Sequence, residues 1–442
     1  MTKTKERKLT LPVAIMININ IMLGAGIFLN TAKLAKKIGA LGSFGYVIIG
    51  ALMLPLVISI ARLTGMHPDG GFYAFGKKEL SPLAGFLAAW GYFIGKLGSG
   101  ALMAHFSLKL IQQLVPILGN VNILILDAIV IGGFVLLNML NIKSGGRIQT
   151  GFTILKLIPI VFAILCGLYL FNPANISAAN SFWEGIPATL PLLFYASMGF
   201  EAACVISCKI KNPQKNAPKA IIISYLIALS IAAVYQLMFY GALGQALAQL
   251  PIPEYQYVFP ALLKKLLPYL PKIAQYIQVI LHLALASSAL GGSYGIMFSN
   301  TWNLHTLAKN KHLLFSDWFT KLNRHAIPFA CVIVEGLIYM IYLLVSSGNQ
   351  IPLQQMSSLG VVFAYTLSVL AFLTAKIKRT TIKTPIWIPI IGLVNCGILA
   401  FFCIKGLFEK GFSSLVTFTI LLLLGSIMFF ATSAKSKQEA LP

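Results

Sequence analysis

Apolar runs of the length that crosses a bilayer, about 20 residues, recur along this chain from Leu11 almost to Thr432. In hydrocarbon every backbone N–H and C=O group needs a partner within the protein, so segments of this kind form helices. Charged residues make up only 10% of the chain, whereas soluble domains carry about 25%, and this difference excludes the soluble class. We therefore predict an all-α integral membrane protein with about 12 transmembrane helices. The predicted spans are residues 11–30, 41–61, 82–110, 121–140, 149–171, 186–207, 219–242, 273–304, 327–346, 354–375, 385–404 and 413–432.

The basic residues are distributed unevenly between the two sides of these spans. The chain carries 34 Lys and Arg against 11 Asp and Glu, a net charge of +23 that in a soluble protein would suggest nucleic acid as a partner. With the N-terminus inside, most of the Lys and Arg fall in the cytoplasmic segments, as the positive-inside rule requires. We therefore expect a multi-pass protein of the cell inner membrane, embedded in the lipid bilayer, with both termini cytoplasmic and no nucleic-acid partner. This topology places eight lysines outside. Two of them, Lys405 and Lys410, lie in the last outer loop, and the six that depart from the rule lie in two other loops: Lys33, Lys36, Lys37, Lys264, Lys265 and Lys272.

No pattern in the sequence indicates catalysis or a metal site. The histidines form no zincin pair, and no glycine-rich phosphate loop occurs. We expect no cofactor, no metal and no enzyme activity. The six cysteines fall in or beside apolar spans without metal-ligand spacing and are interpreted as packing residues: Cys166, Cys204, Cys208, Cys331, Cys396 and Cys403.

Glycines interrupt the first and the sixth predicted spans. Gly24 and Gly26 lie in the middle of the first span, where each costs about 1 kcal/mol relative to alanine. One interpretation is close helix packing through small residues, and the other is a broken helix. Residues 195–201 (Tyr-Ala-Ser-Met-Gly-Phe-Glu) interrupt the sixth span at a similar depth, and paired interruptions of this kind are typical of a transporter site. Broken helix ends offer N–H groups to an anion and carbonyls to a cation, and a zwitterionic amino acid has one charge of each sign.

Further motifs accompany the two breaks. They are Pro-Asp-Gly-Gly-Phe-Tyr at 68–73, Gly-Phe-Glu at 199–201, Lys-Asn-Pro at 211–213 followed by Ala-Pro at 217–218, and Leu-Gly-Gly at 290–292. With these motifs the chain resembles the amino acid-polyamine-organocation (APC) superfamily from about residue 11 to residue 373. The resemblance implies the leucine-transporter fold in one transmembrane domain over 1–442. Its inverted repeats would be helices 1–5 (11–171) and 6–10 (186–375), with helices 1 and 6 broken and helices 11–12 (385–432) appended. A homodimer is one assembly that remains open.

The same resemblance implies a substrate site at the breaks. Tyr195 falls where relatives often place a gating aromatic, although an aromatic on a membrane helix is more often a packing residue. The groups expected to bind the substrate are Gly24, Ala25 and Gly26 for its carboxylate, and the carbonyls near Ala196, Ser197 and Gly199 for its amino group.

Lys156 lies about eight residues into the fifth span, too deep to snorkel easily. An ionisable residue inside the membrane is a functional hypothesis by default. In some superfamily members a lysine at the matching position resembles a stand-in for a sodium ion. An ammonium there could sit between first-span carbonyls and the hydroxyls of Ser287 and Ser288, making sodium coupling unnecessary. A static structural lysine and a lysine that loads and releases a proton remain alternatives.

Lys96, Glu201 and His282 are second-rank candidates, because each could be a satisfied contact between helices. By the resemblance Lys96 faces the substrate side chain, where it would repel a cation by about 4 kcal/mol at 4 Å and a dielectric constant near 20. Glu201 could compensate this charge. Ile296 stands where cation-selective branches place an aromatic, which removes a platform for a guanidinium. These features favour neutral or acidic substrates over arginine or agmatine.

Two other acidic residues and two cations complete the ionisable candidates. Asp127 and Glu335 are interpreted as packing or interfacial pairs. Arg62 and Lys209 stand where relatives usually have glutamates near the inner gate. An inner gate in this chain would therefore need different partners.

These observations together predict a secondary active transporter, either a permease or an antiporter, that moves amino acids by alternating access. We expect it to be sodium-independent and either proton-coupled or driven by exchange. A polyamine, organic-amine or cationic amino acid exchanger of the same fold is the alternative. A membrane enzyme or a channel is the alternative from another class.

Overall fold

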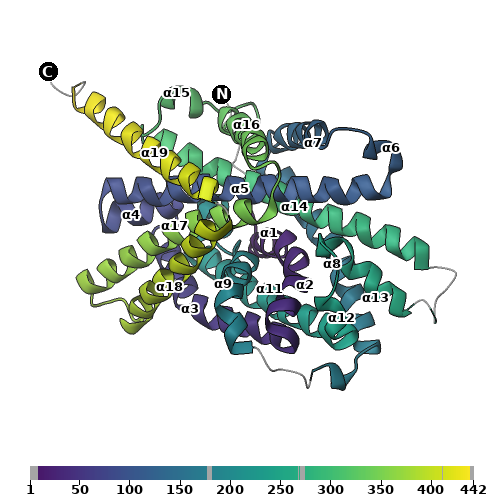
Figure 1. Ribbon diagram of the computed structural model, residues 1–442. Coiled ribbons are helices and arrows are strands. Elements are labelled where there is room, and N and C mark those ends of the chain that lie inside the picture. Colours follow the sequence, from purple (N-terminus) through teal and green to yellow (C-terminus); the bar gives the residue numbers. More distant parts are fainter. Residues whose placement is uncertain (1–7, 177–181, 267, 269–273, 411, 439–442) are drawn as a thin grey trace.

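The computed structural model describes residues 8–176, 182–266, 268, 274–410 and 412–438, and these residues form helices and their connections (Figure 1). The helices over the predicted spans are α1 (Leu11–Met22), α2 (Ala25–Ile38), α3 (Gly42–Met66), α5 (Pro82–Leu114), α7 (Ile123–Asn138), α8 (Ile142–Tyr169), α9 (Phe182–Ser197), α10 (Ala202–Val205), α11 (Pro213–Leu243), α14 (Ala274–Lys309), α16 (Phe329–Ser346), α17 (Gln350–Lys378), α18 (Trp387–Lys410) and α19 (Phe412–Gln438). Short elements fill the connections: α4 (Gly71–Glu79), α6 (Pro116–Gly119), α12 (Gln245–Ala248), α13 (Val258–Leu266), α15 (Ser316–Phe319), η1 (Gly39–Leu41), η2 (Pro173–Asn175), η3 (Ser207–Lys209) and η4 (Glu254–Gln256).

The all-α membrane class predicted from the sequence is confirmed. Among the described residues, eight helical stretches are long and apolar enough to cross a membrane, and α1 and α7 are shorter apolar helices. The first and the sixth predicted spans are each divided into two helices, α1 with α2 and α9 with α10. Lys264 and Lys265 lie on α13, a helix that the apolar pattern did not predict, and Lys272 lies outside the described residues.

Two long helices form the centre of the bundle. The 33-residue α5 packs along the 36-residue α14 and along α17 (Figure 1). Small residues let the backbones of α5 and α17 approach closely, because a Cβ atom on Gly360 would lie 2.6 Å from both Gly91 O and Gly95 Cα. Since any larger side chain would push these helices apart, the glycines fix their spacing.

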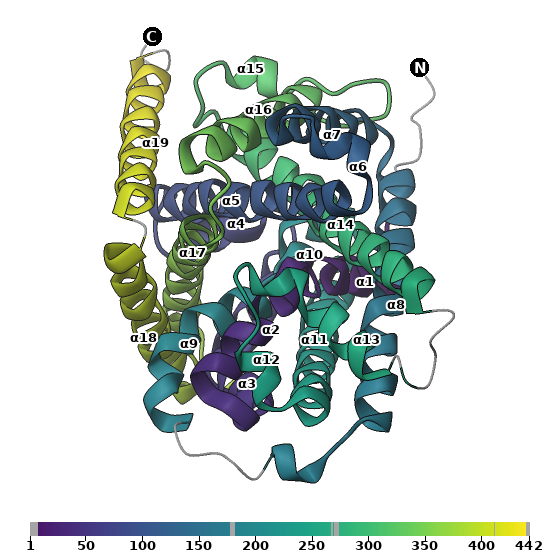
Figure 2. The same ribbon diagram turned by 45° about the vertical axis from the view of Figure 1, so that its right-hand side comes forward.

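The last two helices lie along one edge of the bundle (Figure 2). On α19 the side chains of Leu423, Leu424 and Ile427 are 58%, 54% and 64% exposed. An apolar face of this size is expected where lipid, rather than water, surrounds the protein.

The α5–α17 contact leads to a prediction about stability. Gly360→Ala should lower the thermal unfolding midpoint of the detergent-solubilised protein, because overpacking against backbone typically costs about 1–3 kcal/mol. Gly132→Ala on α7 is the matched control, since a Cβ atom there would meet nothing within 4 Å. Equal midpoints for the two variants would contradict the close packing.

Candidate functional site

Two helix breaks face one another inside the bundle. The helix α1 ends at Met22 and α2 begins at Ala25, whereas α9 ends at Ser197 and α10 begins at Ala202. Gly199, with φ +124°, lies in the second break, and a Cβ atom on it would approach the Met22 backbone nitrogen to 2.8 Å. A side chain therefore does not fit between the breaks at this point. Gly26, in the first turn of α2, lies equally close to α9, because its Cβ atom would be 2.9 Å from Ala196 Cα.

The Lys156 ammonium binds the carbonyls that the first break leaves without helical partners. Its Nζ atom donates hydrogen bonds to Asn20 O and, at 3.1 Å, to Leu23 O. Ser288 Oγ on α14 donates to the same Leu23 oxygen at 3.3 Å. Lys156 and Ser288 are fully buried, and the adjacent Ser287 is half-buried. Three helices thus meet around the Lys156 Nζ atom. Ser287 is not among the groups bonded to α1 in the described part of the chain.

Two asparagines of α1, which the sequence reasoning did not single out, tie the first break to its surroundings. Asn18 Nδ2 donates to Phe200 O at 2.7 Å, and Asn18 Oδ1 accepts from the Ala203 backbone N–H at 2.9 Å. Asn20 Nδ2 donates to Gly291 O of α14 at 2.8 Å. The signal in the sequence was two amides within an apolar run, where an unpaired polar group is costly.

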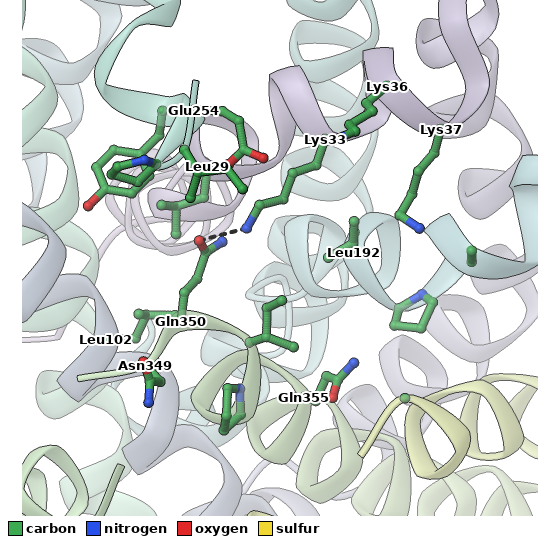
Figure 3. Close-up of a pocket in the computed structure, with 18 of the residues that line it drawn as sticks. Leu29, Lys33, Lys36, Lys37, Leu102, Leu192, Glu254, Asn349, Gln350 and Gln355 are labelled. Atoms are coloured by element: carbon green, nitrogen blue, oxygen red, sulfur yellow. Dashed lines mark hydrogen bonds between the residues drawn. The ribbon is translucent and has the colours of Figure 1, made fainter. Parts of the chain in front are cut away.

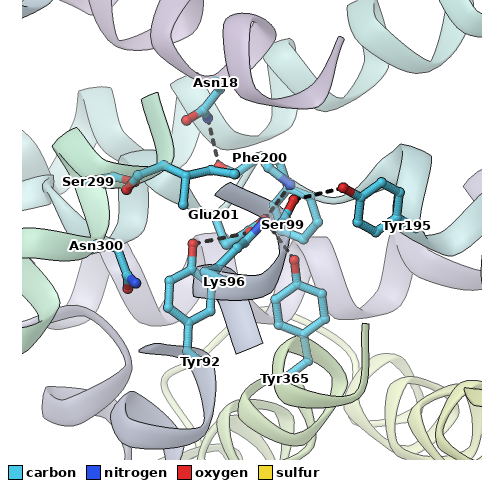
Figure 4. Close-up of polar contacts among 12 residues, drawn as sticks. Asn18, Tyr92, Lys96, Ser99, Tyr195, Phe200, Glu201, Ser299, Asn300 and Tyr365 are labelled. Carbon is cyan, nitrogen blue, oxygen red and sulfur yellow. Dashed lines mark hydrogen bonds and ion pairs between the residues drawn. The ribbon is translucent and has the colours of Figure 1, made fainter. Parts of the chain in front are cut away.

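Lys96 and Glu201 form a buried ion pair at the second break (Figure 4). Their Nζ and Oε1 atoms are 2.7 Å apart. Glu201 also accepts from the Tyr365 hydroxyl and from the Gly199 backbone N–H, both at 2.7 Å, and from the Tyr92 hydroxyl at 3.2 Å. The carboxylate therefore holds the break in place and balances the Lys96 charge.

Other predicted residues lie around the same space. The Tyr195 hydroxyl is 2.9 Å from Ser99 Oγ, and Ile296 of α14 is buried. The side chain of Ala25 is outside the described residues. Met103 is a residue that the sequence did not indicate, and its thioether fills the space between two glycines. A Cβ atom on Gly24 would lie 2.4 Å from Met103 Cε, and one on Gly292 would lie 2.5 Å from its Sδ.

A cavity of about 1310 Å³, which we call the lysine cavity, opens beyond the C-terminal half of α2 (Figure 3). Lys33 reaches across it and donates a hydrogen bond to Gln350 Oε1, at the start of α17, at 2.8 Å. The charged residues that line the cavity are Lys33, Lys36, Lys37, Lys109 and Lys405 together with Glu184, Glu254 and Glu409. The lining therefore has more positive than negative side chains.

At the opposite end of the bundle, Glu79 connects three elements. Its Oε1 atom lies 2.6 Å from His67 Nε2, at the end of α3, and 2.9 Å from an Arg379 nitrogen, beyond α17. The Lys209 ammonium lies 4.2 Å from the Trp302 ring centre, and Arg62 is exposed. Neither of these ion pairs of Glu79 involves Arg62 or Lys209.

A second contact at this end joins α4 to the segment after α14. Burial and the nearby Lys77 lower the pKa of His312 to about 4, and burial raises the pKa of Tyr73 to about 12. Both groups are therefore neutral at physiological pH. The Tyr73 hydroxyl and His312 Nε2 are hydrogen-bonded at 2.7 Å.

Of the remaining ionisable candidates, Glu335 and Asp127 each contact a neighbouring helix and His282 contacts its own helix. Glu335 accepts from Thr301 at 2.9 Å, Asp127 lies 2.7 Å from His105, and His282 Nδ1 lies 2.8 Å from Gln278 O of its own helix. The described residues contain no group of three or more His, Cys, Asp or Glu side chains that could hold a metal ion.

Comparison with known proteins identifies the family of this chain. The family model for amino acid permeases matches residues 9–433, which is nearly the whole chain. The chain belongs to the amino acid permease family. Its membership of the APC superfamily, expected from the motifs, is therefore confirmed, and the protein is a multi-pass membrane transporter rather than an enzyme.

Two relatives of this permease span most of its length. An uncharacterized transporter of Mycobacterium tuberculosis is 25% identical over 402 residues, which cover 90% of the permease and 86% of the relative. An arginine/ornithine antiporter of Latilactobacillus sakei is 24% identical over 360 residues, which cover 76% and 72%.

The buried ion pair of the permease leads to the second prediction. Glu201→Gln leaves the Lys96 ammonium without its carboxylate, so the free energy of unfolding should fall by about 3–5 kcal/mol. The double variant Lys96→Met/Glu201→Gln removes both charges and should recover part of that loss. A double-mutant cycle of thermal stability measures the coupling, and strictly additive effects would contradict a direct ion pair.

Proposed function

We propose that this permease carries amino acids by alternating access, independently of sodium. The observation that carries the proposal is the Lys156 ammonium on the carbonyls of Asn20 and Leu23, directly beside the α1–α2 break. A helix N-terminus attracts a carboxylate, so Gly24, Ala25 and Gly26 would bind that end of the substrate. The carbonyls of Ala196, Ser197 and Gly199 would bind its amino group.

The proposed architecture is the leucine-transporter fold in a single domain. Its repeats are residues 11–171 and 186–375, and residues 385–432 are the two additional helices. The bias of Lys and Arg supports cytoplasmic termini in the inner membrane. In that orientation the lysine cavity faces outward, and the Glu79 contacts close the cytoplasmic side.

Sodium independence follows from the position of one charge. Lys156 already supplies one positive charge to carbonyl oxygens, with Ser288 Oγ bound to one of the same oxygens. A sodium ion at this place would meet an ammonium at contact distance, and like charges at about 4 Å repel by several kcal/mol at intermediate dielectric. Either a proton gradient or exchange would then supply the driving force.

Neutral or acidic amino acids are the favoured substrates. The Lys96–Glu201 pair adds no net charge to the site, and the lysine cavity has five lysines against three glutamates. Ile296 gives no aromatic platform for a guanidinium. The second candidate is exchange of cationic amino acids, which the name of the Latilactobacillus sakei relative supports.

Counterflow in proteoliposomes, with a panel of labelled amino acids, tests the function and the substrate class. We expect neutral or acidic amino acids to be exchanged best, with arginine and ornithine weaker by about tenfold, or about 1.4 kcal/mol. Preferential exchange of arginine would support the second candidate, and counterflow of no amino acid would overturn the proposal.

A pair of variants ties the same assay to the site. Gly26→Ala places a methyl group against the Ala196 backbone and should reduce counterflow by about tenfold or more. Gly151→Ala, on α8, adds its methyl group where nothing lies within 4 Å and should leave counterflow unchanged. Undiminished counterflow by correctly inserted Gly26→Ala would contradict the assignment of the break as the substrate site.

A further inference from the structure

A histidine and an aspartate form a buried pair beside the lysine cavity. His105 Nδ1 on α5 lies 2.7 Å from Asp127 Oδ2 on α7. His105 is 3% exposed and Asp127 is fully buried. Neither residue takes part in the two breaks, so the function proposed above leaves the pair unexplained.

Each partner keeps one polar atom unused. His105 Nε2 and Asp127 Oδ1 are buried and have no hydrogen-bond partner among the described residues. His105 also lines the lysine cavity, which gives the imidazole a route to water. A buried polar atom without a partner is costly, and such an atom next to a water-accessible cavity is suited to bind a small ligand.

The proton is the ligand that this chemistry fits. When Asp127 is ionised and His105 is neutral, the pair carries one uncompensated negative charge. One added proton makes the pair neutral overall, whichever partner holds it. Because an uncompensated charge costs more free energy in a dry interior than beside water, exclusion of water from the cavity favours the protonated pair.

The imidazole also contacts the segment that borders the cavity. Gly348, with φ +66°, lies in the turn between α16 and α17, and a Cβ atom on it would lie 2.2 Å from His105 Nε2. Two residues later, Gln350 accepts the hydrogen bond from Lys33 across the cavity. The His105 imidazole therefore packs against the turn that leads directly into Gln350. A change in the charge or position of the imidazole would act on this turn first.

Charged residues of several elements lie around the same cavity. Lys109, one turn further along α5, Lys33 of α2 and Glu254 of η4 line it together with His105. On α7, Asp127 is the sole ionisable residue within Ile123–Asn138. On α16, Glu335 is held by Thr301.

We propose that His105 and Asp127 form a proton-binding site, loaded from the lysine cavity, whose occupation favours the closed form of that cavity. The proton comes from water in the cavity and binds to the pair without other chemistry. By linkage, closure raises the affinity for the proton and the proton favours closure to the same extent. Lower pH on the cavity side therefore shifts the population towards the closed form.

Distances between two spin labels across the cavity test this proposal. The labels are attached at Ile252→Cys, before η4, and Lys405→Cys, on α18, two exposed cavity-lining positions, after replacement of the native cysteines. Between pH 8 and pH 6 the distance distribution should shift towards shorter values.

His105→Gln and Asp127→Asn, which nearly preserve shape and remove the titrating pair, should abolish the shift. His282→Gln is the matched control, because His282 is a buried membrane histidine bonded to its own helix, and it should keep the shift.

Every outcome decides the proposal. A distribution that does not change with pH in the protein with both labels, or a shift that persists in His105→Gln and Asp127→Asn, would overturn it. Failure of both variants to insert would identify the pair as purely structural and would also overturn it. The proposal uses the orientation and closure of the transporter proposed above, but the distance measurement needs no substrate. Its failure leaves the counterflow result standing, and absent counterflow leaves the distance result standing.

Discussion

The site depends on one electrostatic contact, the Lys156 ammonium bound to the carbonyl oxygens of Asn20 and Leu23. A helix that stops inside a membrane leaves carbonyls without intrahelical partners, and no lipid group can satisfy them. A buried ammonium has the complementary need, since it must find acceptors or lose its charge. The break between α1 and α2 and the lysine on α8 therefore stabilise one another. In the proposed function, the N–H groups at the start of α2 would bind the substrate carboxylate.

The second break is also stabilised by a buried charged side chain, in this case a carboxylate rather than an ammonium. Glu201 accepts from the Gly199 backbone N–H and pairs with Lys96 of α5. Asn18 joins the two breaks through Phe200 O and the Ala203 N–H. In alternating access the segments around the two breaks would have to move, and these few polar contacts are the ones that would have to break and re-form. By contrast, α5 and α17 are fixed by glycine contacts that permit little change in spacing.

Much of this arrangement could be predicted from the sequence because membrane solvation is a strong local constraint. Long apolar runs have to be helical, and the glycines at 24 and 26 and the segment 195–201 indicated where helices stop. The resemblance to the APC superfamily implied that Lys156 lies between first-span carbonyls and the hydroxyls of Ser287 and Ser288. Of these two serines, Ser288 is the one bonded to such a carbonyl among the described residues. Pairings between distant helices could not be predicted. The contact of His105 with Asp127, the position of Met103 between Gly24 and Gly292, and the binding of Glu79 to Arg379 depend on how helices rotate and cross, which the apolar pattern does not determine. The lysines at 33, 36 and 37 were exceptions to the charge rule, and their common place in a cavity became visible only in three dimensions.

The most direct test of the account is the sodium dependence of transport. Counterflow of the best substrate is measured in proteoliposomes in sodium chloride and in choline chloride, for the unmodified protein and for Lys156→Met. If the ammonium occupies the cation position, the unmodified protein transports equally well in both salts, and Lys156→Met, which is similar in length but uncharged, loses transport in both. A strict requirement of the unmodified protein for sodium would contradict the account.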